Sequence, residues 1–594
     1  MSQPGQPLDQ PGPEDVADAL HHGRSPAELG GADERAEVAG ATDPDQVTDG
    51  PVTAAGVTVV TTGAALLQAR HTQLEDAAAA GLASLLAAKT PTLWGPDATL
   101  EASRRLGWVD EPRTVRPILP RLAELRAELQ AEGLTRVVLA GMGGSSLAPE
   151  VITRTAGVDL VVLDSTDPGQ VRAALDPAEL SRTVVVCSSK SGGTLETDSH
   201  RRAAIAAFIA TGMSAAEAAR RIVVVTDPGS PLEETARQLG VREVFLADPD
   251  VGGRYSALTA FGLVPSALAG VDVEELLDEA LALEPALGSL VRNPALALGA
   301  ALGGGGVDGR DKVLLAPGPD SPTGFGDWAE QLIAESTGKQ GRGLLPVVVE
   351  SVAAATEEST GDTHIVVVGG EPPAAGSSVT GRLGALFQAW EYAVAVAGRS
   401  LSIDPFDQPN VQESKDNTNA LLASYDGKDL PEGTPVLTVD GVTVFDDTGT
   451  LAGDEGDLTA VLARVLAAVP ERGYLAVMAY LDRHAQADLA GLRAMLASRL
   501  AHPVTFGWGP RFLHSTGQFH KGGPQVGVFL QVTGDLDGPD LDIPTRSFSF
   551  GRLQRAQALG DLRALGQRGR PAVRLHLTDR RVGVAALLSA AGRL

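Results

Sequence analysis

The residues best suited to do chemistry in this chain lie at 184–197, where an apolar run gives way to hydroxyls, a lysine and two glycines: VVVCSSKSGGTLET. A buried parallel strand that delivers a loop to the start of a helix has this pattern. Such a loop offers free backbone N–H groups, hydroxyl donors and glycines for close approach, and a helix N-terminus adds a favourable dipole. The segment therefore predicts a phosphate-binding turn at Ser189–Thr194, with a capped polar turn as the plainer alternative.

A second turn of the same kind lies upstream at 137–149, with the sequence VVLAGMGGSSLAP. It lacks the third glycine of a dinucleotide fingerprint, and no Gly-Lys-Ser/Thr closes it as in a Walker loop. In an open α/β sheet, ligands bind at the carboxyl ends of the strands. Two donor-rich turns on two strands of one sheet therefore predict a sugar phosphate held between them.

The composition excludes several classes of protein. The chain has 594 residues and a formal net charge of −27, which argues against nucleic acid or an anionic membrane surface as a partner. A single cysteine, Cys187 at the end of an apolar run, allows no intramolecular disulfide and no cysteine metal cluster, and packing is its expected role. No run is long enough to span a membrane, and the acidic, Pro-rich start lacks a signal-peptide core, so we expect a cytoplasmic protein.

The order of apolar patterns predicts the organisation of the chain. Residues 1–52 should form a disordered acidic tail, 53–120 a helical segment, 121–271 a first α/β domain and 272–594 a second one. Both domains are expected to be three-layer α/β/α sandwiches with mainly parallel sheets, because strands alternate with helices. The expected strands are 136–140, 159–163, 183–187, 222–226, 243–246, 312–316, 344–350, 364–368, 474–479, 503–506 and 526–531. The expected helices include 64–88, 121–132, 196–211, 232–239, 272–286, 326–335, 378–397 and 485–499.

Five motifs resemble those of the glucose-6-phosphate isomerase family. They are GMGGS at 141–145, SKSGGT at 189–194, DVGGRYSALT at 250–259, ESTGK at 335–339 and FDQPNVQESK at 406–415, in which Pro409 and Asn410 depart from the usual residues. The resemblance covers about residues 120 to 530. It implies two sugar-isomerase (SIS-type) domains, a sugar phosphate substrate, no metal or organic cofactor, and usually a homodimer whose site is completed by the partner subunit.

The catalytic roles follow from this resemblance. Interconverting an aldose and a ketose needs ring opening and a proton shuttle between C1 and C2 through a cis-enediol, and one carboxylate can carry that proton. The resemblance assigns this base to Glu335, stabilisation of the enediolate charge to Arg254, and ring opening to Lys415 with a histidine. Taken alone, a helix-end glutamate, a loop arginine and a helix lysine would more often be solvated charges.

The histidine has two candidates. The family places Gly-Gln-His between its glutamate and lysine motifs, whereas here HSTGQFHKGG at 514–523 follows Lys415. The order of elements is therefore rearranged, and we favour His520 over His514. The full set of predicted substrate-binding residues is Gly144, Ser145, Ser189, Lys190, Ser191, Gly192, Gly193, Thr194, Thr197, Gln331, Gln408 and His514.

Two alternatives to glucose-6-phosphate isomerase stay open. One is an isomerase that also accepts mannose 6-phosphate, because discrimination at C2 depends on the shape of the pocket. The other is a non-catalytic, sugar-phosphate-binding regulator built on the same domains. A regulator needs the phosphate turns but not Glu335, Arg254 and Lys415 together, and this favours an enzyme.

Overall fold

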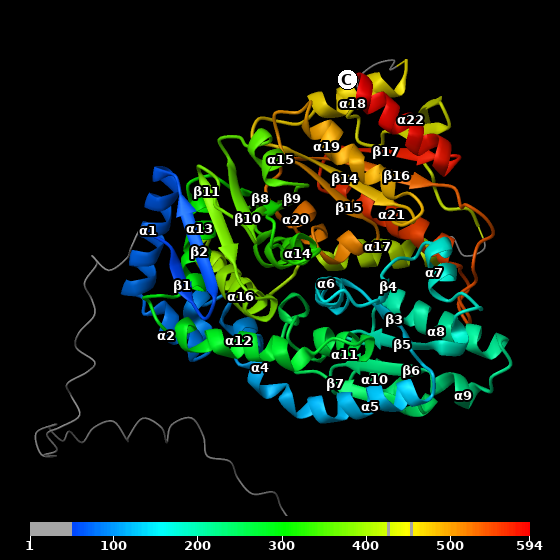
Figure 1. Ribbon diagram of the computed structural model, residues 1–594. Helices are drawn as coiled ribbons and strands as arrows, with labels where there is room; N and C mark the ends of the chain where they lie inside the picture. Colours follow the sequence, from blue (N-terminus) through cyan, green and yellow to red (C-terminus); the bar gives the residue numbers. More distant parts are fainter. Residues whose placement is uncertain (1–49, 425–427, 452–455) are drawn as a thin grey trace, which may run out of the picture. The chain divides into compact units, whose positions relative to one another are not determined.

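The computed structural model describes residues 50–424, 428–451 and 456–594, and all of them belong to one compact unit, Val47–Leu594. Almost all of the expected acidic tail therefore lies outside the described residues. Three β-sheets organise the described chain, and helices pack against each of them (Figure 1). We call them sheets 1, 2 and 3. The predicted α/β class with mainly parallel sheets is confirmed.

Sheet 1 is fully parallel, with the order β4-β3-β5-β6-β7. Its strands are β3 (Arg136–Gly141), β4 (Val161–Leu163), β5 (Thr183–Ser188), β6 (Ile222–Thr226) and β7 (Glu243–Leu246). Every residue of β5 is buried, and Val184 and Val186 enter one hydrophobic core while Val185 and Cys187 enter another. This alternation explains the continuous apolar run, because helices cover both faces of the strand. The covering helices are α5 (Leu119–Ala131), α6 (Leu147–Thr155) and α11 (Ala260–Ala269) on one face, and α7 (Pro168–Ala174), α8 (Leu195–Ala210), α9 (Ala215–Ala219) and α10 (Pro231–Leu239) on the other.

Sheet 2 has the order β1-β2-β11-β10-β8-β9, and its four strands from β8 to β11 are parallel. β2 pairs antiparallel with β11, so the segment expected to be helical from residue 53 also supplies two strands. The strands are β1 (Val52–Ala54), β2 (Val57–Thr62), β8 (Lys312–Pro317), β9 (Leu345–Val348), β10 (Thr363–Val368) and β11 (Gly376–Thr380). The helices of this part are α1 (Ala64–Ala79), α2 (Leu82–Ala87), α3 (Thr99–Ala102), α4 (Glu111–Thr114), α12 (Val273–Leu287), α13 (Pro294–Val307), α14 (Phe325–Thr337), α15 (Val352–Glu357) and α16 (Leu383–Ser400).

Sheet 3 has the order β12-β13-β17-β16-β14-β15, and only β12 and β13 are antiparallel to their neighbours. Its strands are β12 (Pro435–Val439), β13 (Val442–Phe445), β14 (Tyr474–Tyr480), β15 (Val504–Trp508), β16 (Gly527–Gly534) and β17 (Ala572–Leu577). Its helices are α18 (Leu458–Ala467), α19 (Leu492–Ala497), α20 (Gly517–Gly522), α21 (Phe550–Gln567) and α22 (Arg580–Arg593). The stretch 272–594, expected to hold one domain, therefore contains most of sheet 2 and all of sheet 3.

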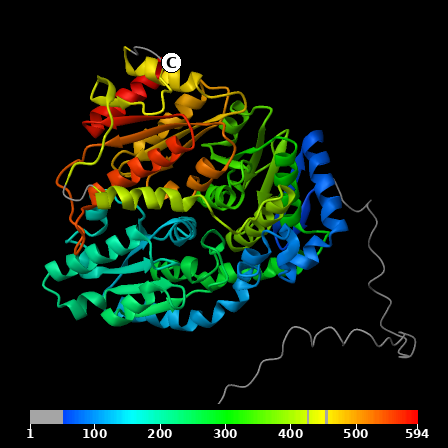
Figure 2. The same ribbon diagram turned by 180° about the vertical axis from the view of Figure 1, so that it is seen from behind.

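The sheets are joined by shared cores. Leu314 of sheet 2 and Ala476 and Phe529 of sheet 3 belong to the same hydrophobic cluster. Helix α17 (Val411–Ser424) lies between sheet 1 and sheet 3 in both views (Figures 1 and 2), and its Leu421 packs into the core shared by α8 and α21. This packing brings loops from three sheets to one place. Within the described ranges, no helix has the length and apolar character needed to cross a bilayer.

Candidate active site

Glu335 lies in the last turn of α14, and only 5% of the residue is exposed. Burial raises the pKa of its carboxyl, because the charged form loses water, while Arg254, His514 and Lys339 act in the opposite direction. One Arg254 guanidinium nitrogen, Nη1, is 3.8 Å from Glu335 Oε2. A buried carboxylate with a raised pKa beside a fixed cation is suited to take a proton from carbon and return it.

Arg254 is held in place by three hydrogen bonds. Its Nε donates to Ser336 Oγ at 2.9 Å, and its Nη2 donates to the carbonyls of Pro405 at 2.5 Å and Asp407 at 3.0 Å. Ser336 in turn donates to the Tyr255 hydroxyl at 3.2 Å. These bonds leave Nη1 on the side of Glu335, so the positive charge is oriented before any substrate arrives.

Lys339 is a second buried cation in the same cluster. Its Nζ donates to the carbonyl of Asp404 at 2.7 Å, to the carbonyl of Asp407 at 2.6 Å and to Asp407 Oδ1 at 2.6 Å. Burial and the nearby Arg254 charge lower the pKa of Lys339 to about 8, although Asp407 favours its charged form. The loop at 404–407 therefore binds both cations, and three motifs from separate parts of the sequence form one cluster.

The glycine turn after β3 lies directly against this cluster. A Cβ atom at Gly144 would be 1.8 Å from the Gly253 carbonyl oxygen, so no side chain fits there. At Gly143, where φ is +56°, a Cβ would be 2.7 Å from Gln331 Nε2 and 2.9 Å from the His514 carbonyl oxygen. The glycines of this turn thus allow close approach of backbone to the Arg254 loop, to α14 and to the His514 loop.

Gln331 and His514 link α14 to sheet 3. Gln331 Nε2 donates to the His514 carbonyl at 2.8 Å and to Glu335 Oε2 at 3.4 Å. The His514 ring nitrogen Nε2 is 3.3 Å from Glu196 Oε1, and Gln557 Nε2 donates to the same carboxylate oxygen at 2.6 Å. Burial alone would raise the pKa of Glu196, but the hydrogen bond and charge of His514 outweigh it and hold that pKa at about 2. Glu196 is therefore a permanent anion behind His514.

The five sequence motifs do not include Glu196. A signal was present in the sequence: Glu196 is the second residue of the helix that follows the predicted phosphate turn. A carboxylate next to an anion site is unfavourable unless a cation partner lies beside it. The structure supplies that partner as His514, which comes from more than 300 residues further along the chain.

His520, the histidine favoured by the sequence, lies in a different environment. Only 2% of the residue is exposed, and among the described residues neither ring nitrogen has a hydrogen-bond partner. Its ring centroid lies 5.1 Å from that of Phe529 and 5.9 Å from that of Phe512. Burial lowers the pKa of His520 well below its usual range. Helix α20 turns this ring into the core of sheet 3, so the structure brings His514, and not His520, to Glu335.

The two predicted residues of the FDQPNVQESK motif at 406–415, Gln408 and Lys415, are more exposed. Lys415 lies on the solvent-facing side of α17, and its positive charge helps to lower the pKa of Glu196. It therefore acts on the same carboxylate as His514. Gln408 is exposed in the loop that precedes α17.

The predicted phosphate turn forms a closed hydroxyl cluster at the start of α8. Ser189 Oγ donates to Thr194 Oγ1 at 3.0 Å, and the Gly193 N–H donates to Ser191 Oγ at 3.3 Å. The ammonium group of Lys190 points elsewhere, to Asp227 Oδ2 at 2.6 Å and the Pro249 carbonyl at 3.2 Å. The turn therefore presents hydroxyls and backbone N–H groups, and its lysine is already paired. Ser145 lies at the start of α6, after the glycine turn.

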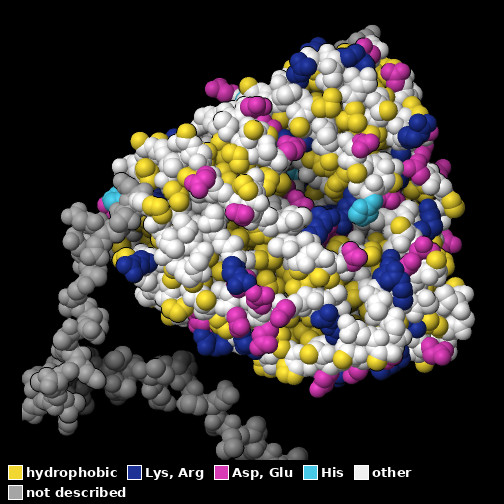
Figure 3. Space-filling view, in the orientation of Figure 1, with side chains coloured by type: hydrophobic (Ala, Val, Ile, Leu, Met, Phe, Trp, Pro, Cys, Tyr) yellow, Lys and Arg dark blue, Asp and Glu magenta, His cyan; other side chains and the backbone are white. Residues whose placement is uncertain are grey.

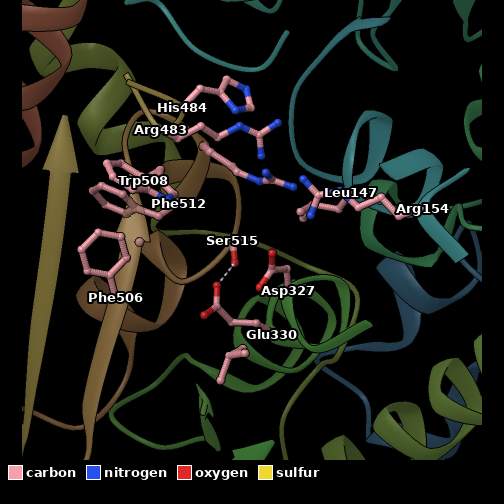
Figure 4. Close-up of a pocket in the computed structure, with 13 residues that line it drawn as sticks. Leu147, Arg154, Asp327, Glu330, Arg483, His484, Phe506, Trp508, Phe512 and Ser515 are labelled. Carbon is pink, nitrogen blue, oxygen red and sulfur yellow. Dashed lines mark hydrogen bonds between the residues drawn. The ribbon is translucent and has the colours of Figure 1, made fainter. Parts of the chain in front are cut away.

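The loop that carries His514 is anchored beside a cavity of about 240 Å³. Ser515 Oγ donates to Glu330 Oε1 at 2.9 Å, and Arg511 Nε is 3.2 Å from Asp164 Oδ2. Figure 4 shows Arg483 and Arg154 reaching into this cavity from sheet 3 and α6, with Asp327 and Glu330 of α14 on another wall. Basic and histidine side chains also gather on this face of the molecule in the space-filling view (Figure 3). Burial and the neighbouring Asp327 raise the pKa of Glu330 to about 8.

A protein metal site needs several ligating side chains close together. Across residues 50–424, 428–451 and 456–594, no cluster of three or more His, Cys, Asp or Glu side chains is arranged to hold a metal ion.

Known proteins match one part of this chain closely. Residues 127–290 match the family model described as phosphoglucose isomerase. A glucose-6-phosphate isomerase of Cyanothece sp. is 35% identical over 244 residues, which cover 39% of this chain and 45% of that protein. A chloroplastic glucose-6-phosphate isomerase of Arabidopsis thaliana is 36% identical over 218 residues, which cover 35% of each chain. The match thus spans less than half the length of these relatives.

Two solved structures share the fold over a longer stretch. A hypothetical protein from Thermus thermophilus superposes with a TM-score of 0.50 at 23% identity, covering 60% of this chain and 98% of that one. A glucose-6-phosphate isomerase from Chlamydia trachomatis superposes with a TM-score of 0.50 at 19% identity, covering 64% of this chain and 91% of that one. Residues 127–290, which hold both phosphate turns and the Arg254 loop, are thus the part of this chain that is similar to the phosphoglucose isomerase family.

Proposed function

We propose that the protein is a glucose-6-phosphate isomerase that interconverts glucose 6-phosphate and fructose 6-phosphate. The observation that supports this most strongly is the buried pair of Glu335 and Arg254, 3.8 Å apart and bordered by a glycine turn and the His514 loop. Aldose–ketose isomerisation requires one base that can reach two adjacent carbons and one fixed positive charge for the enediolate. The cluster offers both.

The reaction divides into two tasks for these residues. Glu335 takes the proton from C2 of the open-chain aldose and returns it to C1, while Arg254 stabilises the negative charge of the cis-enediolate. Ring opening requires a proton donor and an acceptor at the ring oxygen and the anomeric hydroxyl. We assign this task to His514, with Glu196 behind it, and to Lys415. The hydroxyls and N–H groups of the Ser189–Thr194 turn, together with Ser145, bind the phosphate.

The assembly of the site bears on the proposed quaternary structure. A homodimer remains our proposal from the resemblance, and a cytoplasmic location remains our proposal from the composition. In this chain, however, His514 reaches Gln331 and Glu196 from the chain's own sheet 3. The ring-opening histidine therefore does not have to come from a second copy.

The proposal is tested by a coupled assay that converts fructose 6-phosphate to glucose 6-phosphate, repeated with mannose 6-phosphate as substrate. Glu335→Gln keeps the shape of the side chain and removes the base, which typically lowers turnover by ~10²–10⁴-fold. Glu274→Gln, at an exposed position of α12, is the matched control and should retain wild-type turnover. The wild type should also incorporate deuterium at C2 of glucose 6-phosphate from heavy water. Wild-type turnover and exchange in Glu335→Gln would overturn the assignment, and a purely regulatory protein would show neither activity.

A further inference from the structure

A cavity of about 230 Å³ lies beside the predicted phosphate turn, between α8 and α10. Ser189, Gly193 and Thr194 form one wall of this cavity, and arginines form another. Arg201 and Arg202 come from α8, whereas Arg546 comes from the segment between β16 and α21. The groups of the active-site cluster (Glu335, Arg254 and His514) do not line this cavity.

The cavity has an excess of positive charge. Three guanidinium groups share the single carboxylate of Asp198: Arg201 Nη2 at 2.6 Å, Arg202 Nε at 2.7 Å and Arg546 Nη2 at 2.8 Å. The other residues that line the cavity are uncharged, so its walls carry a formal charge of +2 in a chain whose net charge is −27. Local positive charge of this size in an acidic protein marks a place where an anion is stabilised.

Two polar groups of the cavity wall lack partners. Arg201 is 6% exposed and Thr197 2% exposed, and neither Arg201 Nε nor Thr197 Oγ1 has a hydrogen-bond partner among the described residues. A buried donor without a partner costs free energy, which a bound acceptor would recover. Arginine guanidiniums match the oxygens of a phosphoryl group in geometry as well as in charge.

We propose that Arg201, Arg202 and Arg546 form a phosphoryl-binding pocket behind the Ser189–Thr194 turn. Since Lys190 is paired with Asp227, these arginines supply the positive charge that the turn lacks. Arg546 closes the pocket from the part of the chain that carries sheet 3. The phosphoryl group belongs either to the sugar substrate of the proposed function or to a separate phosphate ion or phosphorylated metabolite.

Calorimetric titration of the full-length protein with inorganic phosphate tests the pocket without relying on turnover. Arg546→Ala and Arg202→Ala should each weaken phosphate binding by about tenfold or more, because each removes a charge-assisted contact. Arg546→Lys should restore part of the loss, since it keeps the charge. Asp198→Asn should tighten binding, because it removes the one negative charge on the wall. Arg382→Ala, which removes an exposed, carboxylate-paired arginine at the start of α16, is the control and should bind as the wild type does.

The opposite effects expected on phosphate affinity, weaker in the arginine variants and tighter in Asp198→Asn, distinguish a binding role of the arginines from a structural one. If the arginines only held the segment at 546 against α8, Asp198→Asn would weaken phosphate binding or leave it unchanged, and either result would overturn the proposal. Wild-type affinity for phosphate in both Arg546→Ala and Arg202→Ala would also overturn the proposal. Inhibition kinetics with inorganic phosphate identify the occupant of the pocket. If phosphate competes with fructose 6-phosphate in the wild type and not in Arg546→Ala, the pocket binds the substrate's own phosphate. If phosphate inhibits the wild type non-competitively and this inhibition is lost in Arg546→Ala, the pocket binds a separate ligand. Loss of isomerase activity in every variant with unchanged phosphate binding would count against the pocket and leave the proposed reaction intact.

Discussion

Replacing Glu196 by Gln should slow ring opening and leave proton transfer between C1 and C2 intact. The carboxylate oxygen lies 3.3 Å from His514 Nε2 and is held on its other side by Gln557. Because the pKa of Glu196 is about 2, the group is negatively charged throughout the working pH range. In the proposed reaction it therefore stabilises the positive charge that His514 gains while moving a proton at the sugar ring.

The size of the effect follows from this distance. At an effective dielectric constant of about 20, two unit charges separated by this distance attract by roughly 5 kcal/mol, which is an upper bound. The amide of Gln keeps the shape and one hydrogen bond, so we expect a net loss of about 1.5–3 kcal/mol, as for a hydrogen bond to a charged group. Since each 1.36 kcal/mol or so corresponds to a tenfold change in rate, turnover of closed-ring fructose 6-phosphate should fall by about 10- to 160-fold.

The assay compares two substrates. The ring of fructose 6-phosphate must be opened before isomerisation, whereas an analogue that lacks the ring-forming 5-hydroxyl is always in the open-chain form. Glu196→Gln and His514→Asn should be slow on the first and close to wild type on the second, while Glu335→Gln should be slow on both. His520→Phe is the control, because a phenyl ring fits among Phe512 and Phe529. The reasoning is refuted if Glu196→Gln turns over both substrates at the wild-type rate, or if a folded His520→Phe variant loses closed-ring turnover.

Three further predictions concern stability and assembly. The pKa of Glu330 is raised from 4.5 to about 8 in the folded chain, so its contribution to stability is fully present below pH 4.5 and is lost as the pH rises toward 8. The melting temperature of the wild type relative to that of Glu330→Gln should therefore fall between pH 5 and 8.5 in calorimetry. A constant difference between the two melting temperatures would contradict the burial argument. Gly144→Ala would place a Cβ 1.8 Å from the Gly253 carbonyl oxygen and should cost about 2 kcal/mol or more in urea unfolding, whereas Gly288→Ala, with its nearest neighbour at 3.6 Å, should cost under about 1 kcal/mol. Since the chain itself brings His514 to Gln331, specific activity should stay constant on dilution from micromolar to nanomolar protein, and a loss on dilution that is reversed by concentration would show that a second copy is required.

The strands β3, β5 and β6 of sheet 1 and the strands β8, β9 and β10 of sheet 2 could be predicted because they are apolar and largely buried. A continuous β-branched run such as 183–188 is typical of a strand covered by helices on both sides. The strands that escaped prediction each have an antiparallel neighbour. β2 has the sequence VTVVTT with alternately buried residues, and β11 has the polar sequence GSSVT, whose end falls within the helix expected at 378–397. Their pairing depends on strands more than 300 residues apart, and no local pattern records that.

The candidate site was predictable to the extent that each residue sits in a local motif. Glu335 and Arg254 were predicted in this way, and the structure places them 3.8 Å apart. The choice between the two histidines could not be made from the motif, because HSTGQFHKGG places them six residues apart and only the folded chain gives the two rings different surroundings. His520 packs against Phe529, while His514 precedes the helix in a loop that faces Glu196.

The buried cations explain why separate motifs must be present together. Arg254 and Lys339 repel each other electrostatically, and the repulsion helps to lower the pKa of Lys339. Two like charges remain buried because the carbonyls of Asp404, Pro405 and Asp407 accept hydrogen bonds from them, and because the carboxylates of Glu335 and Asp407 lie beside them. Without the loop at 404–407, Arg254 would lose two of its three hydrogen bonds and the orientation that places Nη1 beside Glu335. The motif at 406–415 thus acts on Glu335 through Arg254, even though its own Gln408 and Lys415 are exposed.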